Sequence, residues 1–323
     1  MSHDPAVAPA PGTGSGRSVL AVDVGGTQIK VAVLDESGRL GPIARHATPR
    51  DPRDPAGVVV AAIASAAADL SARGARFSAV GLAVPGIVDD RGVGVHSTNL
   101  GWRDFPFTER AAAALGLPVA VVHDVRAAGL AEHRLGAARG AADAAIVTLG
   151  TGIAAALIID GRPYTGRGYA GELGHSIVDP SGPSCRCGQT GCLEAIASAR
   201  AIVERYRAAG GPGVDAAEVV ARAQAGDPLA RRVWQSAIDA LAYGLAQVTA
   251  LLAPEVVVLG GGLSESGDAL LLPLRESLRR RRRHGVIPRL ERAALGQDAG
   301  TWGAAIAARD LLDGRDDVAR GTA

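Results

Sequence analysis

The stretch SVLAVDVGGTQIKVAVL (Ser18–Leu34) decides how this chain of 323 residues begins to fold. Its two halves, SVLAVDV and QIKVAVL, are runs of aliphatic and β-branched residues, and only Gly25, Gly26 and Thr27 separate them. Two such runs joined by a short glycine-bearing connection predict a β-hairpin. Asp23 lies two residues before the first glycine, so the pattern places a carboxylate beside the turn.

This glycine turn has the chemistry of a phosphate site. Its two glycines let the backbone bend tightly and bring N–H groups close to an anion. Thr27 adds a hydroxyl donor, and Asp23 can hold a hydrated Mg²⁺ ion. A plain hairpin turn with an edge aspartate explains the same residues equally well. Two other phosphate loops are excluded, because the single lysine, Lys30, does not follow a glycine and the GTGSG segment precedes the first strand.

A second hairpin of the same kind occurs further along the chain. Ala144–Leu149 and Ile153–Ile159 are predicted strands, separated by Gly150, Thr151 and Gly152. The repeat indicates a weak internal duplication and two α/β domains of related build. Periodicity predicts further strands over residues 79–84, 119–122, 255–259 and 289–292. It predicts helices over residues 54–73, 108–115, 124–134, 199–208, 216–225, 227–252, 268–283 and 299–312.

A third glycine cluster follows the predicted strand 255–259. Gly260 and Gly261 stand between that strand and the next helix, where they leave room for a flat or bulky group such as an adenosine. Glycine-rich turns after strands are common, so each of the three clusters is weak evidence alone. Their order and spacing together favour a nucleotide site.

Composition excludes several classes of protein. The chain is 47% hydrophobic and 21% charged, which excludes a disordered protein. A formal net charge of +1 argues against nucleic-acid binding through bulk phosphate attraction. Three cysteines exclude a disulfide framework and favour the cytoplasm. Residues 1–17 read as a disordered tail rather than a signal peptide, and no apolar run is long enough to cross a membrane.

The cysteines form the sharpest local signal. Cys185, Cys187 and Cys192 lie in the run CRCGQTGCLE and are all the cysteines of the chain, while His175 lies ten residues upstream. Three thiolates and one imidazole complete a tetrahedral Zn²⁺ site. No ligand position is left open, so we expect the zinc to be structural.

Three polar residues are ambiguous from their local sequence. Asp124 follows a predicted strand and opens a helix in VVHDVRAAGLAE, where it suits either a general base or a simple N-cap. The local sequence alone favours the N-cap. Asn99 in STNLGW and Glu172 in GYAGELGH suit either turns or hydrogen bonds to a ligand.

These motifs together resemble the ROK family of repressors, open-reading-frame proteins and sugar kinases. The resemblance rests on Asp23–Lys30, Leu149–Gly152, Glu172–His175 and CRCGQTGCLE, and it extends over 19–312. It implies an actin-like, ribonuclease H-like ATPase fold of α/β class, with two domains around a central cleft. The expected division is a small domain over 18–122, on which a C-terminal helix near 299–315 packs, and a larger domain over 123–298 that carries the zinc loop.

The resemblance also implies an activity, namely transfer of the γ-phosphate of ATP to a sugar hydroxyl, most simply O6 of glucose. Asp124 is then the catalytic base, and His175 serves both zinc and sugar. The implied sugar-binding set is Asn99, His123, Asp124, Glu172, His175 and Glu194. The implied set for ATP and Mg²⁺ is Asp23, Gly25, Gly26, Thr27, Lys30, Gly150, Thr151, Gly152, Gly260 and Gly261. A homo-oligomer, dimer or tetramer, is also expected.

One departure from the family leaves the sugar open. The kinases read Asn-Asp-Ala-Asn where this chain reads His123-Asp124-Val125-Arg126, and the first Asn normally touches a sugar hydroxyl. An N-acetylhexosamine kinase and a non-catalytic sugar sensor are therefore the alternatives. A repressor needs a DNA-binding domain ahead of the first turn, for which residues 1–22 leave no room. The basic run 279–284 reads as a solvated helix end, with polyphosphate as a minor alternative donor.

Overall fold

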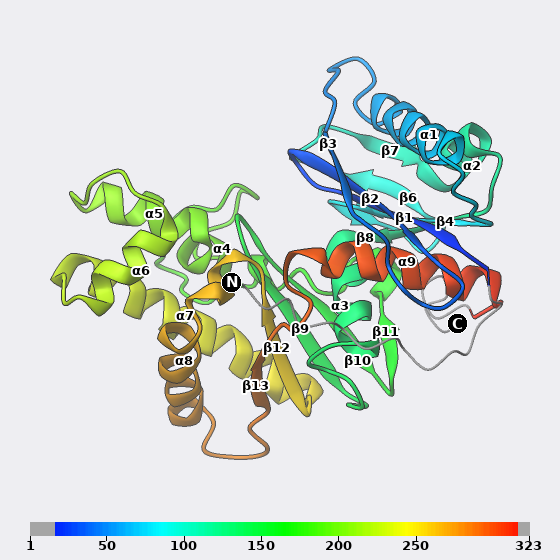
Figure 1. Cartoon of the computed structure of the whole chain (residues 1–323). Helices are drawn as coiled ribbons and strands as arrows, with labels where there is room; N and C mark the ends of the chain where they lie inside the picture. Colours follow the sequence, from blue (N-terminus) through cyan, green and yellow to red (C-terminus); the bar gives the residue numbers. More distant parts are fainter. Residues whose placement is uncertain (1–16, 316–323) are drawn as a thin grey trace. The chain divides into compact units, whose positions relative to one another are not determined.

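The computed structural model describes residues 17–315, and these form two compact units (Figure 1). Unit 1 comprises the described residues up to Leu135, Arg162–Ala170 and the described residues from Gln297 onward. Unit 2 comprises Gly136–Gly161 and Gly171–Gly296. The chain thus crosses between the units several times, and each unit is described by itself.

Unit 1 is built on a five-stranded sheet of order β3-β2-β1-β4-β8. Strands β2 and β3 run antiparallel to their neighbours, whereas β1, β4 and β8 are parallel to one another. The parallel strands therefore end at one edge, where Asp23 and His123 lie near the ends of β1 and β8. The strands are β1 (Val19–Val24), β2 (Gln28–Leu34), β3 (Ala44–Ala47), β4 (Val80–Val84) and β8 (Val119–His123).

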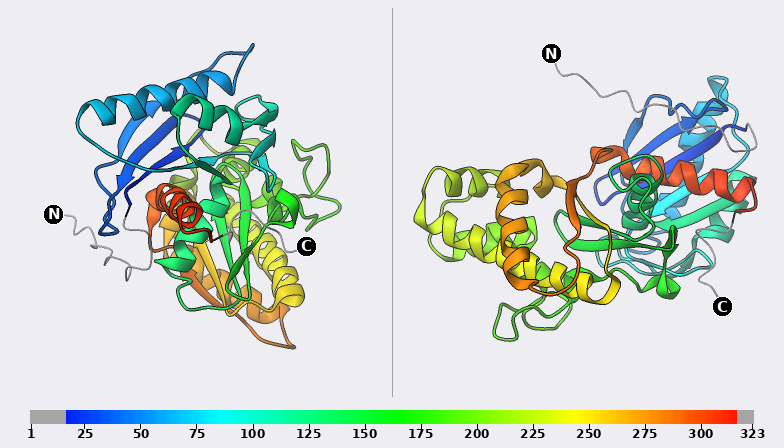
Figure 2. Two further views of the ribbon diagram at one scale, coloured as in Figure 1. Left: turned by 90° about the vertical axis from the view of Figure 1, so that its right-hand side faces the viewer. Right: turned by 90° about the horizontal axis from the view of Figure 1, so that it is seen from below.

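Helices cover both faces of this sheet (Figure 2). Side chains alternate along β1, so Leu20 and Val22 pack with residues of α1 (Gly57–Ala72) and α2 (Phe107–Leu115). Val19 and Ala21 pack on the other face, with α3 (Asp124–Arg134) and α9 (Ala299–Leu312).

The face that α9 covers is packed very closely. A Cβ placed on Gly81 would lie 1.7 Å from the carbonyl oxygen of Ala304, and one on Gly303 would lie 1.8 Å from that of Ala127. Glycine is therefore required at both positions for α9 to approach the sheet and α3. This packing fixes the beginning of α3, and with it the position of Asp124.

A small three-stranded sheet extends unit 1. It consists of β5 (Ile87–Val88), β6 (Val93–His96) and β7 (Arg103–Pro106), in that order. Trp102 and Phe107 anchor it in an edge-to-face contact with ring centroids 5.0 Å apart. The loop between β6 and β7 carries Asn99. Periodicity did not predict this sheet, because its strands have two to four residues.

Unit 2 repeats the same arrangement of strands. Its β9–β10 hairpin is antiparallel, β9 pairs in parallel with β12, and β12 pairs in parallel with β13. This order matches β2-β1-β4-β8 of unit 1, as the repeated hairpin predicts. The strands are β9 (Ala144–Leu149), β10 (Ile153–Ile159), β12 (Val256–Gly260) and β13 (Arg289–Arg292). The helices are α4 (Leu193–Ala197), α5 (Ala199–Ala208), α6 (Ala216–Gln224), α7 (Pro228–Leu252) and α8 (Asp268–Arg281).

The long helix α7 runs through the centre of the core of unit 2, contacting α4, α5, α6 and α8. Trp234, Ile238 and Leu241 are buried on it. Asp227 caps its first turn, and Pro228 occupies the first helical position, where a missing N–H costs nothing.

The observed division of the chain differs from the expected one. The sequence places residues 123–298 in the second domain, whereas α3 and Arg162–Ala170, with the short strand β11 (Arg162–Tyr164), belong to unit 1. The reason for α3 is its close packing against α9 at Gly303. The expected tail over residues 1–17 lies outside the described residues except for Arg17. Among the described residues, no helix combines the length and apolar character needed to cross a bilayer.

Candidate active site

The first glycine turn lies at the end of β1 in unit 1. Gly25 donates its N–H to the carbonyl of Gln28 at 2.8 Å, and a Cβ on Gly25 would lie 3.1 Å from that oxygen. The hydroxyl of Thr48 donates to the carbonyl of Gly25 at 2.8 Å. Gly26 and Thr27 are exposed. The turn is thus held from behind and presents its tip, as a phosphate cradle requires.

Arg50 is a site residue that the sequence did not reveal. Its guanidinium donates to the carbonyl of Gly26 at 2.7 Å and to the carbonyl of Asn99 at 2.9 Å. One side chain therefore joins the first glycine turn to the loop that carries Asn99, a predicted sugar ligand. Arg50 belongs to no motif, and only the three-dimensional structure brings it to these two loops.

Asp23 occupies a buried position at the end of β1. Burial raises the pKa of its carboxyl group to about 6, although the nearby Lys30 opposes the shift. The side chain of Asp23 is 16% exposed, and a Cβ on Gly300 would lie 2.8 Å from its carboxylate. Gly300, at the beginning of α9, is therefore a second site residue that sequence reasoning missed.

Lys30 is an ion-pair partner of the carboxylates rather than part of the turn itself. Its ammonium nitrogen lies 3.7 Å from Asp23 and 3.5 Å from Asp298, and it also donates to the carbonyl of Gln297. The predicted role of Lys30 in nucleotide binding thus rests on its charge beside Asp23.

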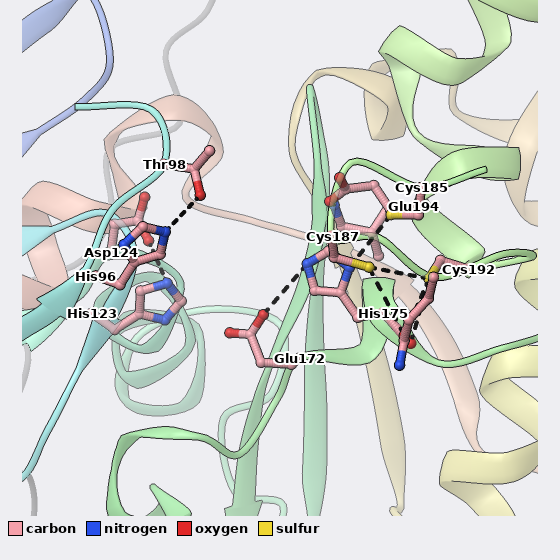
Figure 3. Close-up of polar contacts among 12 residues, drawn as sticks. His96, Thr98, His123, Asp124, Glu172, His175, Cys185, Cys187, Cys192 and Glu194 are labelled. Carbon is pink, nitrogen blue, oxygen red and sulfur yellow. Dashed lines mark hydrogen bonds and ion pairs between the residues drawn. The ribbon is translucent and has the colours of Figure 1, made fainter. Parts of the chain in front are cut away.

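Asp124 lies where β8 passes into α3 (Figure 3). His123 is the N-cap residue, and Asp124 is the first residue of the helix. The carboxylate oxygen Oδ1 of Asp124 lies 3.0 Å from Nε2 of His123 and accepts the N–H of Val125 at 2.8 Å. Burial is the main cause of the raised pKa of Asp23, and the negative charges of Asp124 and Asp298 raise it further. The carboxylates of Asp23 and Asp124 therefore interact electrostatically.

Two other polar side chains of unit 1 are held by contacts within that unit. Arg126 donates from Nη2 to the carbonyl of Val88 at 2.5 Å, which directs that nitrogen toward β5. His96 places its Nε2 3.1 Å from the hydroxyl of Thr98, in the loop of Asn99 (Figure 3). Asn99 itself is exposed, so its amide is open to a ligand.

The glycine clusters of unit 2 come together at one edge of its sheet. Gly150 donates its N–H to the carbonyl of Gly152 at 3.0 Å, closing the turn between β9 and β10. Gly261 has a φ of +80°, and a Cβ there would lie 2.6 Å from the carbonyl oxygen of Leu149. Glycine is therefore needed for the β12 loop to lie on the β9 turn.

Glu194 braces the β9–β10 turn from α4. Its Oε2 accepts the N–H of Ile153 at 3.0 Å, and its Oε1 accepts from Arg200 at 3.1 Å. A Cβ on Gly152 would lie 2.6 Å from Oε2. Arg200, which no motif revealed, thus holds a predicted sugar ligand in one orientation.

Four predicted metal ligands converge in unit 2. The ligand atoms of His175, Cys185, Cys187 and Cys192 all lie within 4.8 Å of one another. One sulfur–sulfur pair and one sulfur–nitrogen pair test the fit: Sγ of Cys187 and Cys192 are 3.7 Å apart, and Sγ of Cys185 lies 3.7 Å from Nδ1 of His175. Zinc bonds of about 2.3 Å to sulfur and about 2.0 Å to nitrogen give tetrahedral edges of about 3.8 Å between two sulfurs and about 3.5 Å between sulfur and nitrogen. The residues therefore fit a tetrahedral zinc ion.

The electrostatics of this cluster also favour a cation. Burial, together with the neighbouring thiols, raises the pKa of Cys192 to about 12. A divalent cation reverses this effect because it stabilises the thiolate. With Nδ1 of His175 on the metal side, Nε2 lies on the other side, 4.0 Å from Oε2 of Glu172 (Figure 3). One imidazole thus links the metal cluster to a predicted sugar ligand.

The two sheets, their shared strand order and the glycine turns at their ends define an actin-like ATPase fold. The chain belongs to the ROK family, whose model matches residues 19–311. Both predictions from the sequence, fold and family, are confirmed.

Individual relatives show which activities this fold supports. A glucokinase of Halalkalibacterium halodurans is 34% identical, with 90% of this chain and 94% of the relative covered. An N-acetylmannosamine kinase of Citrobacter koseri is also 34% identical, over 77% of this chain and 85% of the relative.

Solved structures agree with these relatives. A ROK glucokinase from Streptomyces griseus in complex with glucose and AMPPNP is 35% identical, with a TM-score of 0.78 over 91% of this chain and 99% of that one. A ROK hexokinase from Thermus thermophilus is 39% identical, with a TM-score of 0.81 over 93% and 99% of the two chains.

Proposed function

We propose that this protein is an ATP-dependent hexose kinase that phosphorylates O6 of glucose. The observation that carries the proposal is the placement of Asp124 in unit 1. Its carboxylate lies at the end of β8, electrostatically coupled to Asp23, which adjoins the glycine turn at the end of β1. A base and a phosphate cradle at the same edge of one sheet, on the parallel strands β8 and β1 that flank β4, are what transfer from a nucleotide to a hydroxyl requires.

In the proposed reaction Asp124 accepts the proton of the sugar hydroxyl. The hydroxyl oxygen then forms its bond to the γ-phosphorus of ATP, and the bond from phosphorus to the β,γ-bridging oxygen breaks, releasing ADP. Phosphoryl transfer depends mostly on positioning and charge stabilisation. The loops therefore contribute by holding both reactants. We assign the sugar to Asn99, His123, Glu172, His175 and Glu194. We assign ATP to the glycines and threonines of the two turns and to Gly260 and Gly261.

Two metal ions complete the proposal. Mg²⁺ would be held by Asp23 together with the phosphates, and it supplies charge neutralisation at the transferred group. Zn²⁺ would be held by His175 and the three cysteines and would be structural, since four protein ligands fill its coordination. By fixing the ring of His175, the zinc loop would fix the sugar ligands beside it.

The test is ADP release from Mg-ATP with glucose, mannose, fructose, N-acetylglucosamine and N-acetylmannosamine. We expect a glucose-dependent rate that Asp124→Ala lowers about 10²–10⁴-fold, the usual contribution of a general base. Glu36→Ala, which changes an exposed carboxylate on the turn after β2, is the matched control. A wild-type protein with bound zinc that turns over none of these sugars would refute the proposal.

The second candidate is an N-acetylhexosamine kinase, which the 34% identity to the N-acetylmannosamine kinase of Citrobacter koseri supports. A higher kcat/KM for an N-acetylated sugar than for glucose would select it.

Polyphosphate stays a minor candidate for the donor. In the run 279–284, Arg280 is paired with Glu276 at 3.2 Å and Arg281 lies 3.9 Å from Asp239, as expected of a helix end. A rate of sugar phosphorylation that does not change when polyphosphate is added would exclude polyphosphate as the donor.

Two further proposals concern the setting of the protein. Its three free cysteines and its proposed use of ATP favour the cytoplasm. A homo-oligomer, dimer or tetramer, stays a prediction from the family, and light scattering of the purified protein measures it directly.

A further inference from the structure

Arg50 joins two loops of unit 1 that the proposed function assigns to different reactants. Its Nη2 donates to the carbonyl oxygen of Gly26, in the glycine turn assigned to ATP, at 2.7 Å. Its Nη1 donates to the carbonyl oxygen of Asn99, in the loop assigned to the sugar, at 2.9 Å. We propose that Arg50 is a positioning residue that couples the binding of the nucleotide to the binding of the sugar. The proposal rests on the proposed function, which gives these two loops their ligands.

The carbonyl groups of the glycine turn decide which way its N–H groups point. Thr48 donates from its hydroxyl to the carbonyl of Gly25 at 2.8 Å and from its backbone N–H to the carbonyl of Thr27 at 3.0 Å. Arg50 supplies the donor for Gly26, so all three carbonyls of the turn are held from the segment that follows β3. In a trans peptide the N–H points away from the preceding carbonyl, and residues 17–315 contain no cis peptide bond. The bond from Arg50 therefore directs the N–H of Thr27 to the opposite side, which is left open to a phosphate.

The other loop that Arg50 binds is a tight turn between β6 and β7. Gly101 donates its N–H to the carbonyl of Ser97 at 2.8 Å, and Ser97 donates its own N–H to the carbonyl of Trp102 at 3.1 Å. Ser97 and Trp102 are buried, whereas Asn99 at the tip is exposed. Arg50 holds this tip, because the carbonyl that it binds belongs to Asn99 itself. Loss of the Arg50 side chain therefore frees the backbone from which the proposed sugar ligand projects.

A guanidinium group suits this connection because it is planar and carries its donors in a fixed arrangement. With one nitrogen on each carbonyl, the two loops cannot move independently without breaking a hydrogen bond. Phosphates that order the glycine turn thereby order the Asn99 loop, so a sugar that binds second has less disorder to remove. The coupling is reciprocal, and bound sugar favours the nucleotide by the same factor. A lysine at position 50 keeps the charge but has a single nitrogen, which does not reproduce the two-nitrogen contact.

The binding test uses calorimetry on the full-length protein to measure the Kd of glucose, or of whichever sugar is turned over, with and without Mg-AMPPNP. The ratio of the two Kd values is the coupling factor, and we expect about fivefold or more in the wild type. Arg50→Ala and Arg50→Lys should each bring this factor to within about twofold of one. Arg50 is exposed, so neither change is expected to unfold the protein.

Two matched variants show whether the effect belongs to the connection between the loops. Thr48→Val removes a hydroxyl donor to the glycine turn alone, so it should weaken Mg-AMPPNP but retain the coupling factor. Arg53→Ala, which removes an exposed arginine three residues further on, should change neither. A coupling factor in Arg50→Ala or Arg50→Lys that equals the wild-type value would overturn the proposal.

Amide hydrogen exchange tests the connection without any turnover and without a sugar. In the wild type, Mg-AMPPNP alone should slow exchange both in the glycine turn and in peptides that cover residues 96–102. In Arg50→Ala, saturating Mg-AMPPNP should still protect the glycine turn but leave residues 96–102 unchanged. Equal protection of residues 96–102 in the two proteins, or no protection of them in the wild type, contradicts the proposal.

These measurements separate the failure of this proposal from that of the kinase function. If the wild type binds no nucleotide and turns over no sugar, the proposed function fails and the coupling fails with it. If the wild type turns over sugar but its sugar Kd does not depend on Mg-AMPPNP, only the role of Arg50 is refuted, and the kinase function stands.

Discussion

The two glycine-turn hairpins share a topology but differ in chemistry. The β1–β2 and β9–β10 hairpins have the same place in their sheets, and each turn follows its strand directly. Two residues before the first glycine, however, β1 carries Asp23 and β9 carries Thr148. The hydroxyl of Thr148 is directed to the carbonyl of Ala154 at 3.3 Å, within its own hairpin. One turn thus carries a buried charge, and the other is neutral.

The neutral turn obtains its fixed shape from elsewhere in unit 2. Glu194 accepts the N–H of Ile153 and is held in turn by Arg200. The segment between β10 and β12 that supplies both residues also supplies the cysteine cluster. The repeated hairpin thus provides two turns of the same topology. The residue two positions before the first glycine, and the segment between β10 and β12, give the two turns different chemistry.

The largest expected effect comes from removing the charge that distinguishes the turns. We expect Asp23→Asn to lower kcat/KM for Mg-ATP about 10³-fold, because the proposed magnesium ligand is lost. Thr148→Val in the other turn should change it by less than about threefold. Steady-state kinetics at saturating glucose measure both. Similar losses in the two variants would show that the turns do not differ in the way proposed.

Next in size is the effect of the metal cluster, which only unit 2 contains within the described residues. Purified protein should hold about one zinc per chain. Cys192→Ala should lose it, lower the melting temperature and raise the sugar KM about tenfold or more, because His175 and Glu172 lose their support. Elemental analysis and calorimetry give the readouts. Full metal content in the variant would contradict the assignment.

The charge of Asp23 also predicts how stability depends on pH. Because its pKa rises from 3.8 in the unfolded chain to about 6 in the folded one, the folded state binds more protons between these values. The free energy of unfolding, measured without Mg²⁺, should therefore fall by roughly 2 kcal/mol as pH rises from about 4 to 7. Denaturant titrations of the wild type and Asp23→Asn across this range measure it. The variant should lack this component, and identical pH dependence in both proteins would count against it.

The smallest expected effect concerns Arg200, the support of Glu194. Arg200→Gln should raise the sugar KM about fivefold and leave kcat nearly unchanged, because it releases a ligand rather than the base. Arg207→Gln, an exposed change on the same helix α5, is the matched control. An unaltered KM would mean that the N–H of Ile153 alone is enough to orient Glu194.

Much of the fold was predictable because its patterns are local. The helix over residues 124–134 and the strands over residues 144–149 and 153–159 begin and end as predicted, since glycine turns or a strand end bound them. The cysteine cluster was predictable for a similar reason, because spacing along the chain encodes its ligands. The three-stranded sheet β5-β6-β7 was not predicted, because its pairing depends on the packing of Trp102 and Phe107.

The residues that hold the predicted site residues in place could not be predicted from the sequence. Arg50 and Gly300 lie far along the chain from the residues they contact, and Arg200, although only six residues from Glu194, lies on the next helix. Neither charge pattern nor periodicity encodes such contacts. For the same reason, local sequence favoured a simple N-cap at Asp124, whereas the structure makes it the first helical residue, with Oδ1 3.0 Å from Nε2 of His123.

The central claim is that this chain transfers the γ-phosphate of ATP to O6 of glucose, with Asp124 as base. Phosphorus NMR of a reaction containing Mg-ATP and glucose tests it most directly, because the spectrum identifies the product and its position. We expect glucose 6-phosphate and ADP to appear in equal amounts with the wild type and to stay below about one hundredth of that rate with Asp124→Asn. ADP formed without any sugar phosphate, or equal product from the variant, would contradict the claim.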